Sequence, residues 1–263
     1  MHMARVTVEI ADHVARVTLA RPEKLNAVDP EMLEAIIAAG SEVDRDDVRA
    51  VVLAGEGRAF CAGLDFASFA AMGGLDPREM VLPRTHGDTN RWQQAAMVWH
   101  RLPVPVIAAL HGQVYGAGLQ IAAGADIRIA APDAELAVME MKWGLVPDMG
   151  GMVLLPRLVR SDVLRRLTYT ARPVGGDEAL ALGLVTELAE DPAAAAQALA
   201  HEVAGRSPSA VRAAKRLIAV AESGVEAAEV LMAESREQAG LIGGADQMEA
   251  VAANLARRPP RFE

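Results

Sequence analysis

The sequence predicts an α/β core followed by a C-terminal region built of helices alone. Short apolar strand patterns alternate with helix patterns up to about residue 175. Beyond that point the chain becomes rich in alanine, and residues 193–205, 208–222 and 225–241 are each long enough for an amphipathic helix. We place the α/β core at residues 1–195 and the helical region at residues 196–263. Such a helical end buries little by itself, which favours packing against another subunit.

Composition limits the classes of function. Of 263 residues, 52% are hydrophobic, 3% aromatic and 23% charged, which fits a globular protein and excludes intrinsic disorder. A net charge of −9 argues against a protein that binds nucleic acid with its whole surface. The single cysteine excludes a disulfide framework and a multi-cysteine zinc site. With no 18-residue apolar run and no signal-peptide pattern, we expect a cytoplasmic protein without membrane or nucleic-acid partners.

The individual elements follow from periodicity and capping. Asp29 followed by Pro30 predicts a helix start, because aspartate caps free N–H groups and proline fits the first turn. Strands are expected at residues 5–10, 14–20, 50–54, 106–110, 126–130 and 136–139. Further helices are expected over residues 90–101 and 117–123, after the turn at 147–151, and over 161–171. Residues 66–90 are expected to form a mobile surface segment, and residues 111–115 a loop.

Three glycines lie between an apolar strand and an apolar helix. Gly112, Gly116 and Gly118 superficially match a dinucleotide-binding fingerprint, but Ile121 occupies the position of the third glycine. Nucleotide binding of that type is therefore disfavoured. Two interpretations stay open: close packing of strand and helix, or a backbone N–H directed at an oxyanion from a helix start.

Glu140 is the clearest candidate for acid–base chemistry. It lies among methionine and tryptophan side chains, where burial would raise a carboxyl pKa into the range useful for proton transfer. The alternative is a salt bridge to Lys142 or an arginine. Asp148, considered by itself, is more typical of a helix N-cap. Cys61 is interpreted as a small buried residue rather than a nucleophile, and no histidine spacing suits a metal site.

Several segments together resemble the crotonase superfamily, also called the enoyl-CoA hydratase/isomerase family. They are LARPEKLNAV (19–28), GRAFCAGLDF (57–66), PVIAALHGQVYGAGLQIAAGADIRIA (105–130) and MEMKWGLVPDMGG (139–151). The resemblance covers nearly the whole chain and implies a crotonase-like spiral of ββα units with a helical C-terminal trimerisation region. It also implies a homotrimer or dimer of trimers, and an acyl-CoA thioester substrate from fatty acyl-CoA metabolism. No cofactor is implied beyond the coenzyme A of the substrate.

The resemblance also assigns roles to residues. The N–H groups of Leu64 and Ala117 should form an oxyanion hole, because fixed backbone donors stabilise an enolate without reorganising. Arginine suits phosphate, so two arginines of the basic tail should contact coenzyme A. The residues expected at the substrate are Lys24, Leu25, Ala27, Ala62, Gly63, Asp65, Gly116, Arg257 and Arg258.

One departure from the family pattern bears on the reaction. Hydratases of this family hold a water between two glutamates, of which the second matches Glu140 and the first matches Gln120. An amide orients water or thioester but transfers no proton at neutral pH. This favours double-bond isomerisation, with Glu140 as principal acid/base. Asp148 then resembles the auxiliary acid of dienoyl-CoA isomerases, although the first acid of those enzymes again matches Gln120. The alternatives are enoyl-CoA hydration, other thioester chemistry and a non-catalytic acyl-CoA binder.

Overall fold

The computed structural model describes residues 4–71 and 76–262. Two sheets organise the core, a six-stranded sheet of order β1-β2-β3-β4-β6-β9 and a three-stranded sheet of order β5-β7-β8. The strands are β1 (Val6–Ala11), β2 (Val14–Leu19), β3 (Ala50–Gly55), β4 (Val106–Leu110), β5 (Gln113–Tyr115), β6 (Ile127–Ala130), β7 (Glu135–Ala137), β8 (Val174–Gly175) and β9 (Glu187–Leu188). The mixed α/β architecture predicted from the sequence is confirmed.

The large sheet begins with a hairpin and continues in parallel. β1 pairs antiparallel with β2, placing Val8 opposite Val17, and β2, β3, β4, β6 and β9 then run parallel. Asp12 and His13 both have positive φ at the hairpin turn, as a two-residue turn of this kind requires. The expected strands exist, but the 111–115 loop is partly wrong. Its second half is strand β5, which pairs with β7 in the small sheet.

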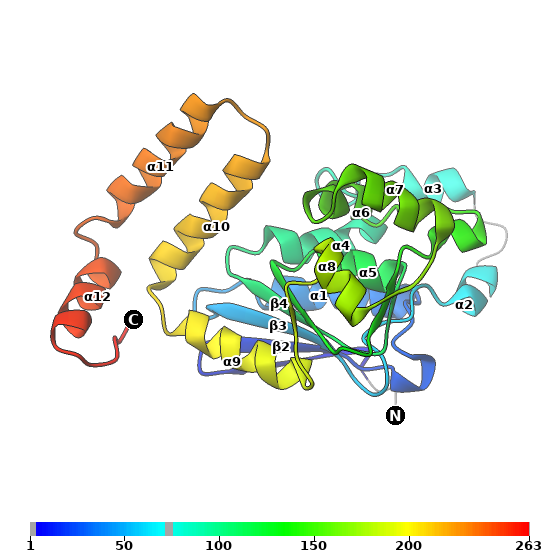
Figure 1. Ribbon diagram of the computed structural model, residues 1–263, viewed down its shortest axis with the longest axis horizontal. Coiled ribbons are helices and arrows are strands. Elements are labelled where there is room, and N and C mark those ends of the chain that lie inside the picture. Colours follow the sequence, from blue (N-terminus) through cyan, green and yellow to red (C-terminus); the bar gives the residue numbers. More distant parts are fainter. Residues whose placement is uncertain (1–3, 72–75, 263) are drawn as a thin grey trace.

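Helices cover both faces of the large sheet (Figure 1). Alternate residues of β3 belong to two separate apolar clusters, with Val51 and Leu53 in one and Val52 and Ala54 in the other. The first cluster includes buried side chains of α1 (Pro30–Glu42) and α4 (Arg91–Arg101), and the second includes α9 (Pro192–Ala204). This division follows from the two-residue side-chain period of a strand.

The expected boundary at 195/196 falls inside α9. Ala196, Ala200 and Ala204 of this helix are buried against the sheet, where small side chains permit close approach. The helices that project from the core are α10 (Pro208–Glu222), α11 (Ala227–Leu241) and α12 (Ala245–Leu255), seen at the left of Figure 1. The projecting arm therefore begins at α10.

The remaining helices include several that the sequence analysis missed. The segment expected to be mobile contains α2 (Phe66–Ala71) and α3 (Pro77–Val81), and Asp76 caps α3 by accepting from the N–H of Arg78. Gly73 and Gly74 of that segment lie outside the described residues. Also present are α5 (Ala117–Ala123), α6 (Gly151–Leu154), α7 (Ser161–Thr170), α8 (Gly176–Leu182) and the short 3-10 helices η1 (Pro22–Lys24), η2 (Glu140–Trp143) and η3 (Leu155–Arg157). Among the described helices, none has the length and hydropathy to cross a membrane.

Gly118 brings the backbone of α5 close to the backbone of Cys61. A Cβ at Gly118 would lie 2.3 Å from the carbonyl oxygen of Cys61. We expect Gly118→Ala to lower the free energy of unfolding in urea by about 1–3 kcal/mol, because the close-packed backbone must shift. The matched control is Gly240→Ala in α11, where a Cβ meets nothing within 4 Å. This control should leave stability unchanged or raise it by up to about 1 kcal/mol. Equal effects of both variants would contradict the close contact.

Candidate active site

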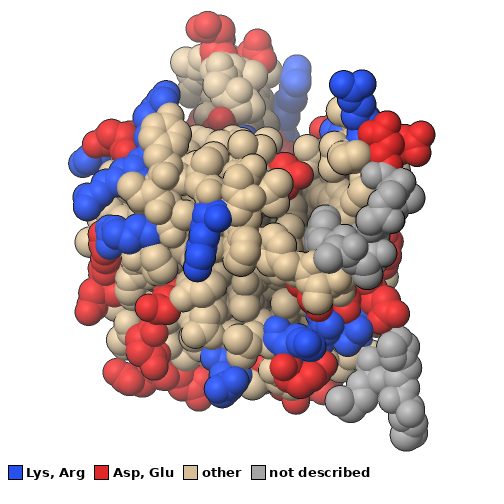
Figure 2. All heavy atoms as spheres, turned by 90° about the vertical axis from the view of Figure 1, so that its right-hand side faces the viewer, with Lys and Arg blue, Asp and Glu red and all other residues tan. Residues whose placement is uncertain are grey.

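A pocket opens between the loop before α2, the start of α5 and the short helix η2. It is lined by Ala62, Gly63, Leu64, Phe66, Tyr115, Gly116, Ala117, Met139, Glu140, Trp143 and Leu145. Glu140 is the only carboxylate among these lining residues, and the rest are apolar, aromatic or glycine. Figure 2 views the molecule from the side on which α2 lies, and a largely uncharged area at its centre is bordered by charged side chains. The pocket suits an apolar group whose reactive atom meets a single acid.

Two residues of the pocket lining have backbone N–H groups without a protein partner among the described residues. Leu64 lies in the loop before α2, and Ala117 is the first residue of α5. Within residues 4–71 and 76–262, neither N–H donates a hydrogen bond to a protein acceptor. Each follows a glycine with positive φ, +101° at Gly63 and +50° at Gly116. Because side chains rarely adopt these conformations, glycine is required at both positions before the two donors.

The loop that carries Leu64 is fixed by a neighbouring loop. The N–H of Val28 donates to the oxygen of Gly63 over 2.8 Å, and the N–H of Asp65 donates back to the oxygen of Val28 over 2.9 Å. These two bonds form a parallel bridge between Val28 and Leu64. They hold the backbone on both sides of Leu64 and leave its own N–H free for a ligand.

Asn26, which the sequence analysis missed, anchors the supporting loop. Its side chain is completely buried and accepts from the N–H of Arg21 over 2.8 Å. Its amide nitrogen donates to the carbonyl oxygens of Glu56 and Ala59 at 2.9 and 2.8 Å. Asn26 also has a positive φ of 54°, which asparagine tolerates better than most residues. The expected coenzyme A contacts Leu25 and Ala27 flank this anchor, so their backbone is fixed beside the pocket loop.

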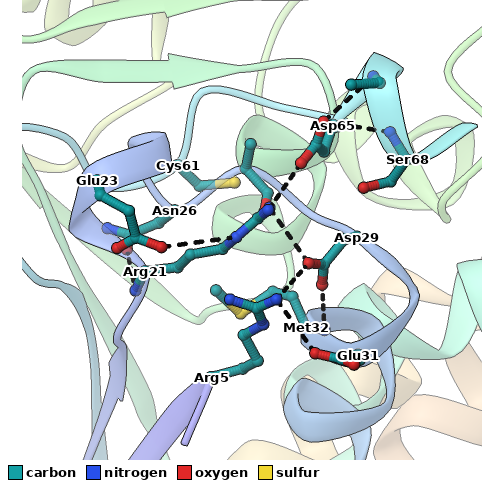
Figure 3. A network of polar contacts seen from close by, with 12 residues as sticks. Arg5, Arg21, Glu23, Asn26, Asp29, Glu31, Met32, Cys61, Asp65 and Ser68 are labelled. Atoms are coloured by element: carbon teal, nitrogen blue, oxygen red, sulfur yellow. Dashed lines mark hydrogen bonds and ion pairs between the residues drawn. The ribbon is translucent and has the colours of Figure 1, made fainter. Parts of the chain in front are cut away.

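A buried network of ion pairs connects the loop that carries Asn26 with the loop that carries Leu64 (Figure 3). The Arg21 guanidinium lies 2.8 Å from the Asp65 carboxylate and 3.3 Å from the Asp29 carboxylate, which Arg5 also contacts at 2.9 Å. Desolvation acts to raise the pKa of Asp65, but hydrogen bonds from Arg21 and from the start of α2 outweigh it and hold the pKa below its usual value. Asp65 is thus engaged with Arg21 and does not line the pocket. Arg21 was also missed by the sequence analysis.

Glu140 is buried, and one of its carboxylate oxygens is hydrogen-bonded to the side chain of Gln120. The residue is 8% exposed, and its Oε1 accepts a 2.6 Å hydrogen bond from Nε2 of Gln120. Its Oε2 has no hydrogen-bond partner among the described residues. Burial raises the pKa of Glu140 above its ordinary value, and the charge of Asp148 adds to that effect, although hydrogen bonds partly oppose it. The alternative of a salt bridge to Lys142 or an arginine is wrong, because within residues 4–71 and 76–262 the Glu140 carboxylate bonds to Gln120 through Oε1 and has no partner at Oε2.

Gln120 is held in one orientation by the protein itself. Its Oε1 accepts from the N–H groups of Met149 and Gly151 at 2.8 and 2.9 Å. Because these two donors fix the carbonyl end, the amide nitrogen must face Glu140. Gln120 therefore acts here as a clamp on Glu140 and on the loop before α6, and its polar atoms are already occupied by protein partners.

Asp148 lies near Glu140 but outside the pocket lining. Its interpretation as a helix N-cap is wrong, since Gly150 precedes α6 and no side-chain cap bond is present there. The residue is exposed, yet surrounding protein atoms partly desolvate its carboxyl group and raise its pKa. Its effect on Glu140 is electrostatic.

The structure does not bring every expected residue to the pocket. Lys24 is exposed on η1. Arg257 and Arg258 follow α12 at the left of Figure 1, whereas α2 and its loop lie at the right. Arg258 is paired with Glu249 at 2.6 Å. Cys61 is buried as expected, and desolvation raises the pKa of its thiol to about 12, which makes it a poor nucleophile.

Comparison with known proteins identifies the family. The family model described as enoyl-CoA hydratase/isomerase matches residues 9–263. The chain belongs to the enoyl-CoA hydratase/isomerase family. The crotonase resemblance inferred from the sequence is thereby confirmed, and the family is one of enzymes.

The relatives include proteins named as isomerases and proteins named as hydratases. The chain is 36% identical to the human mitochondrial Delta(3,5)-Delta(2,4)-dienoyl-CoA isomerase over 212 residues, which cover 77% of this chain and 64% of that enzyme's length. It is 32% identical to a protein named probable enoyl-CoA hydratase in Bacillus subtilis strain 168, with 99% of each chain covered. The crystal structure of enoyl-CoA hydratase from Bacillus anthracis matches with a TM-score of 0.88 at 29% identity, covering 98% of both chains.

The clamp between Gln120 and Glu140 generates a testable prediction. Gln120→Glu would place a second carboxyl oxygen about where Nε2 now lies, 2.6 Å from Glu140. Two ionised carboxylates cannot share that distance, and the N–H groups of Met149 and Gly151 favour the charge on residue 120. We expect the pKa of Glu140, followed by carbon NMR of the carboxyl groups, to rise by at least about 1 unit.

The control for this titration is Gln238→Glu on α11, which adds the same charge on the exposed arm. It should leave the titration of Glu140 unchanged, because solvent screens a distant surface charge. An unchanged midpoint in Gln120→Glu would mean that the two side chains are not in contact.

Proposed function

We propose that this protein transfers a proton on an enoyl-CoA thioester through an enolate held in an oxyanion hole, and that its principal reaction is double-bond isomerisation. The observation that carries the proposal is the composition of one pocket. Its lining includes Leu64 and Ala117, whose N–H groups have no protein partner, and one buried acid, Glu140, with a free oxygen. The neighbouring position 120 is an amide occupied by protein partners, which leaves one proton-transferring group in the pocket.

The proposed steps balance around a single base. The thioester carbonyl of a 3-enoyl-CoA accepts hydrogen bonds from Leu64 and Ala117. Glu140 takes a proton from C2, the C–H electron pair forms the C1–C2 double bond of a dienolate, and the carbonyl oxygen gains the negative charge. Glu140 then returns the proton to C4, where the former C3–C4 double bond receives it and C2–C3 becomes the new double bond. Each backbone donor contributes roughly 2.7–4 kcal/mol of transition-state stabilisation in comparable sites.

The raised pKa of Glu140 fits this cycle. A base that must both accept and return a proton works best when its pKa lies near the working pH. Burial moves the Glu140 pKa in that direction, and the nearby charge of Asp148 supports the shift. In this proposal Asp148 modulates the pKa and Gln120 positions the carboxylate.

Coenzyme A is proposed to run along the loop of Lys24, Leu25 and Ala27 and past Ala62 and Gly63. The N–H of Ala62 donates to the oxygen of Leu25 at 2.9 Å, so these segments form one continuous surface. Arg257 and Arg258 lie at the far end of the same chain. In this proposal they contact the coenzyme A phosphate bound by a neighbouring subunit.

Hydration of a trans-2-enoyl-CoA is the second candidate. It is favoured by the relative from Bacillus subtilis, which matches over 99% of both chains and is named a probable hydratase. In this case Glu140 alone would activate the water, because Gln120 cannot exchange a proton.

Experiments in heavy-oxygen water separate the two reactions. The purified protein is incubated with a 3-enoyl-CoA and, separately, with a trans-2-enoyl-CoA, and the products are separated by chromatography and analysed by mass spectrometry. We expect the 3-enoyl compound to become the conjugated 2-enoyl isomer without incorporation of label. Label in a 3-hydroxyacyl product would instead establish hydration. The absence of both reactions over acyl groups of several lengths would overturn the proposal in favour of a non-catalytic acyl-CoA binder.

Glu140→Gln is the matched variant for this assay. Turnover should fall by at least about 100-fold, because the base is lost, while free coenzyme A binds as before. The raised folded pKa of Glu140 means that wild-type stability decreases as pH rises from the ordinary value of 4.5 through the folded value. The variant lacks this loss, so its free energy of unfolding at pH 7 should equal or exceed that of the wild type. Retained turnover would exclude Glu140 as the base.

We further propose a homotrimer, or a dimer of trimers, assembled through the arm. Helix α11 has no buried residue, and Leu255 at the end of α12 is 82% exposed. In an isolated chain, the arm exposes several large apolar side chains to water, namely Ile218, Leu231, Met232, Ile242, Met248 and Leu255. A patch of this kind is typical of an interface.

Sedimentation equilibrium tests the assembly. We expect a mass of three or six times the 27.8 kDa of one chain. Leu231→Glu combined with Met232→Glu should reduce the mass to that of the monomer, because two charges would be buried without partners. A monomeric wild type would contradict the proposed trimer.

A further inference from the structure

Aromatic side chains are scarce in this protein but gather at the pocket. The chain has four Phe, three Trp and two Tyr residues in 263. Three of these, Phe66, Tyr115 and Trp143, line the pocket that contains Glu140. A composition so poor in aromatic residues makes this concentration at one site a feature that needs a physical explanation.

Phe66 and Trp143 form a contacting pair at the pocket. Their ring centroids are 4.1 Å apart, and the ring planes are tilted by 37°. Both rings are left largely in water, with exposures of 39% for Phe66 and 51% for Trp143. A pair that served only to pack the core would be buried, whereas this pair lines the pocket and stays accessible to a bound group.

Each ring lies a few residues along the chain from one of the groups proposed to act on the substrate. Phe66 lies two residues beyond Leu64, which places it on the order of 6 Å away along an extended backbone. Trp143 ends η2, which Glu140 begins, and three residues of 3-10 helix rise by about 6 Å. An acyl chain whose reacting carbons lie beside Leu64 and Glu140 would therefore reach the pair a few bonds further along.

The third ring is fixed in place. The hydroxyl of Tyr115 donates a 2.6 Å hydrogen bond to the carboxylate of Glu135. Desolvation and this bond raise the pKa of Tyr115 to about 12, so the ring stays neutral in the pocket wall. The lining close to the rings is completed by apolar Met139 and Leu145.

We infer that Phe66 and Trp143 determine acyl specificity and select thioesters that carry a planar aromatic group about two bonds beyond the reacting carbons. This inference rests on the proposed function and adds the class of acyl group to it. Aromatic rings attract one another in offset or tilted arrangements beyond the effect of buried area. A rigid ring also loses less conformational entropy on binding than a flexible alkyl chain of the same carbon number.

A matched pair of substrates tests the inference. The compounds 5-phenylpent-3-enoyl-CoA and undec-3-enoyl-CoA each carry eleven acyl carbons, and both have hydrogens at C2 as isomerisation requires. The phenyl ring of the first is bonded to C5, two bonds beyond C4, so it is conjugated with neither the substrate nor the product double bond. We expect kcat/KM for the phenyl compound to exceed that for the alkyl compound by about three- to tenfold. Trp143→Leu and Phe66→Leu should each bring this ratio towards one, and Trp143→Phe should preserve most of it.

Two further measurements keep the result interpretable. Tyr169→Leu, at an exposed aromatic residue of α7 outside the pocket, should leave the ratio unchanged. Calorimetric binding of the unreactive 5-phenylpentanoyl-CoA and undecanoyl-CoA should show the same preference in Kd, independently of turnover. If neither enoyl compound reacts but the phenyl compound binds more tightly, the proposed function fails and the acyl preference stands. Equal or stronger binding and turnover of the alkyl compounds, or a ratio that Trp143→Leu does not change, would overturn the inference.

Discussion

The hydrogen bond from Gln120 to Glu140, 2.6 Å long, joins the three segments on which the pocket depends. Gln120 lies on α5, whose first N–H is one of the two free donors, and its carbonyl end holds the loop before α6 through Met149 and Gly151. Glu140 begins η2. One buried amide therefore links the start of α5, where the N–H of Ala117 is free, to a buried carboxylate, and it adds no second titratable group beside that carboxylate.

The position of the second free N–H, that of Leu64, depends on buried charged side chains that do not line the pocket. The two hydrogen bonds that flank Leu64 are made with Val28 in the loop after β2, one donated by Val28 and one accepted by it. That loop is held by Asn26 and by the guanidinium of Arg21. Removing either partner of a buried ion pair leaves an uncompensated charge, so this network has a cost if it is incomplete. In its complete form it fixes a backbone N–H in advance of ligand binding, which is the property that electrostatic stabilisation of an enolate requires.

Much of this organisation could be predicted from local sequence patterns, and the remainder depends on contacts between distant residues. Alternation gave β1 and β2, and Asp29 with Pro30 marked the start of α1. The apolar neighbours of Glu140 in the sequence predict its burial, which is confirmed, while its role as acid/base stays a prediction. By contrast, the orientation of Gln120 depends on N–H groups about 30 positions away. The roles of Arg21 and Asn26 likewise depend on partners in other loops, and the short strand β5 forms only because β7 lies beside it.

The burial of Cys61 has a practical consequence. It is the only thiol in the chain, it is completely shielded, and its pKa of about 12 keeps it protonated at neutral pH. A maleimide reagent reacts with thiolates that it can reach, so the folded protein offers no competing target. A cysteine introduced on α11 would therefore accept a fluorophore or spin label selectively without prior removal of the native residue, and distances between labelled copies could be measured directly in solution.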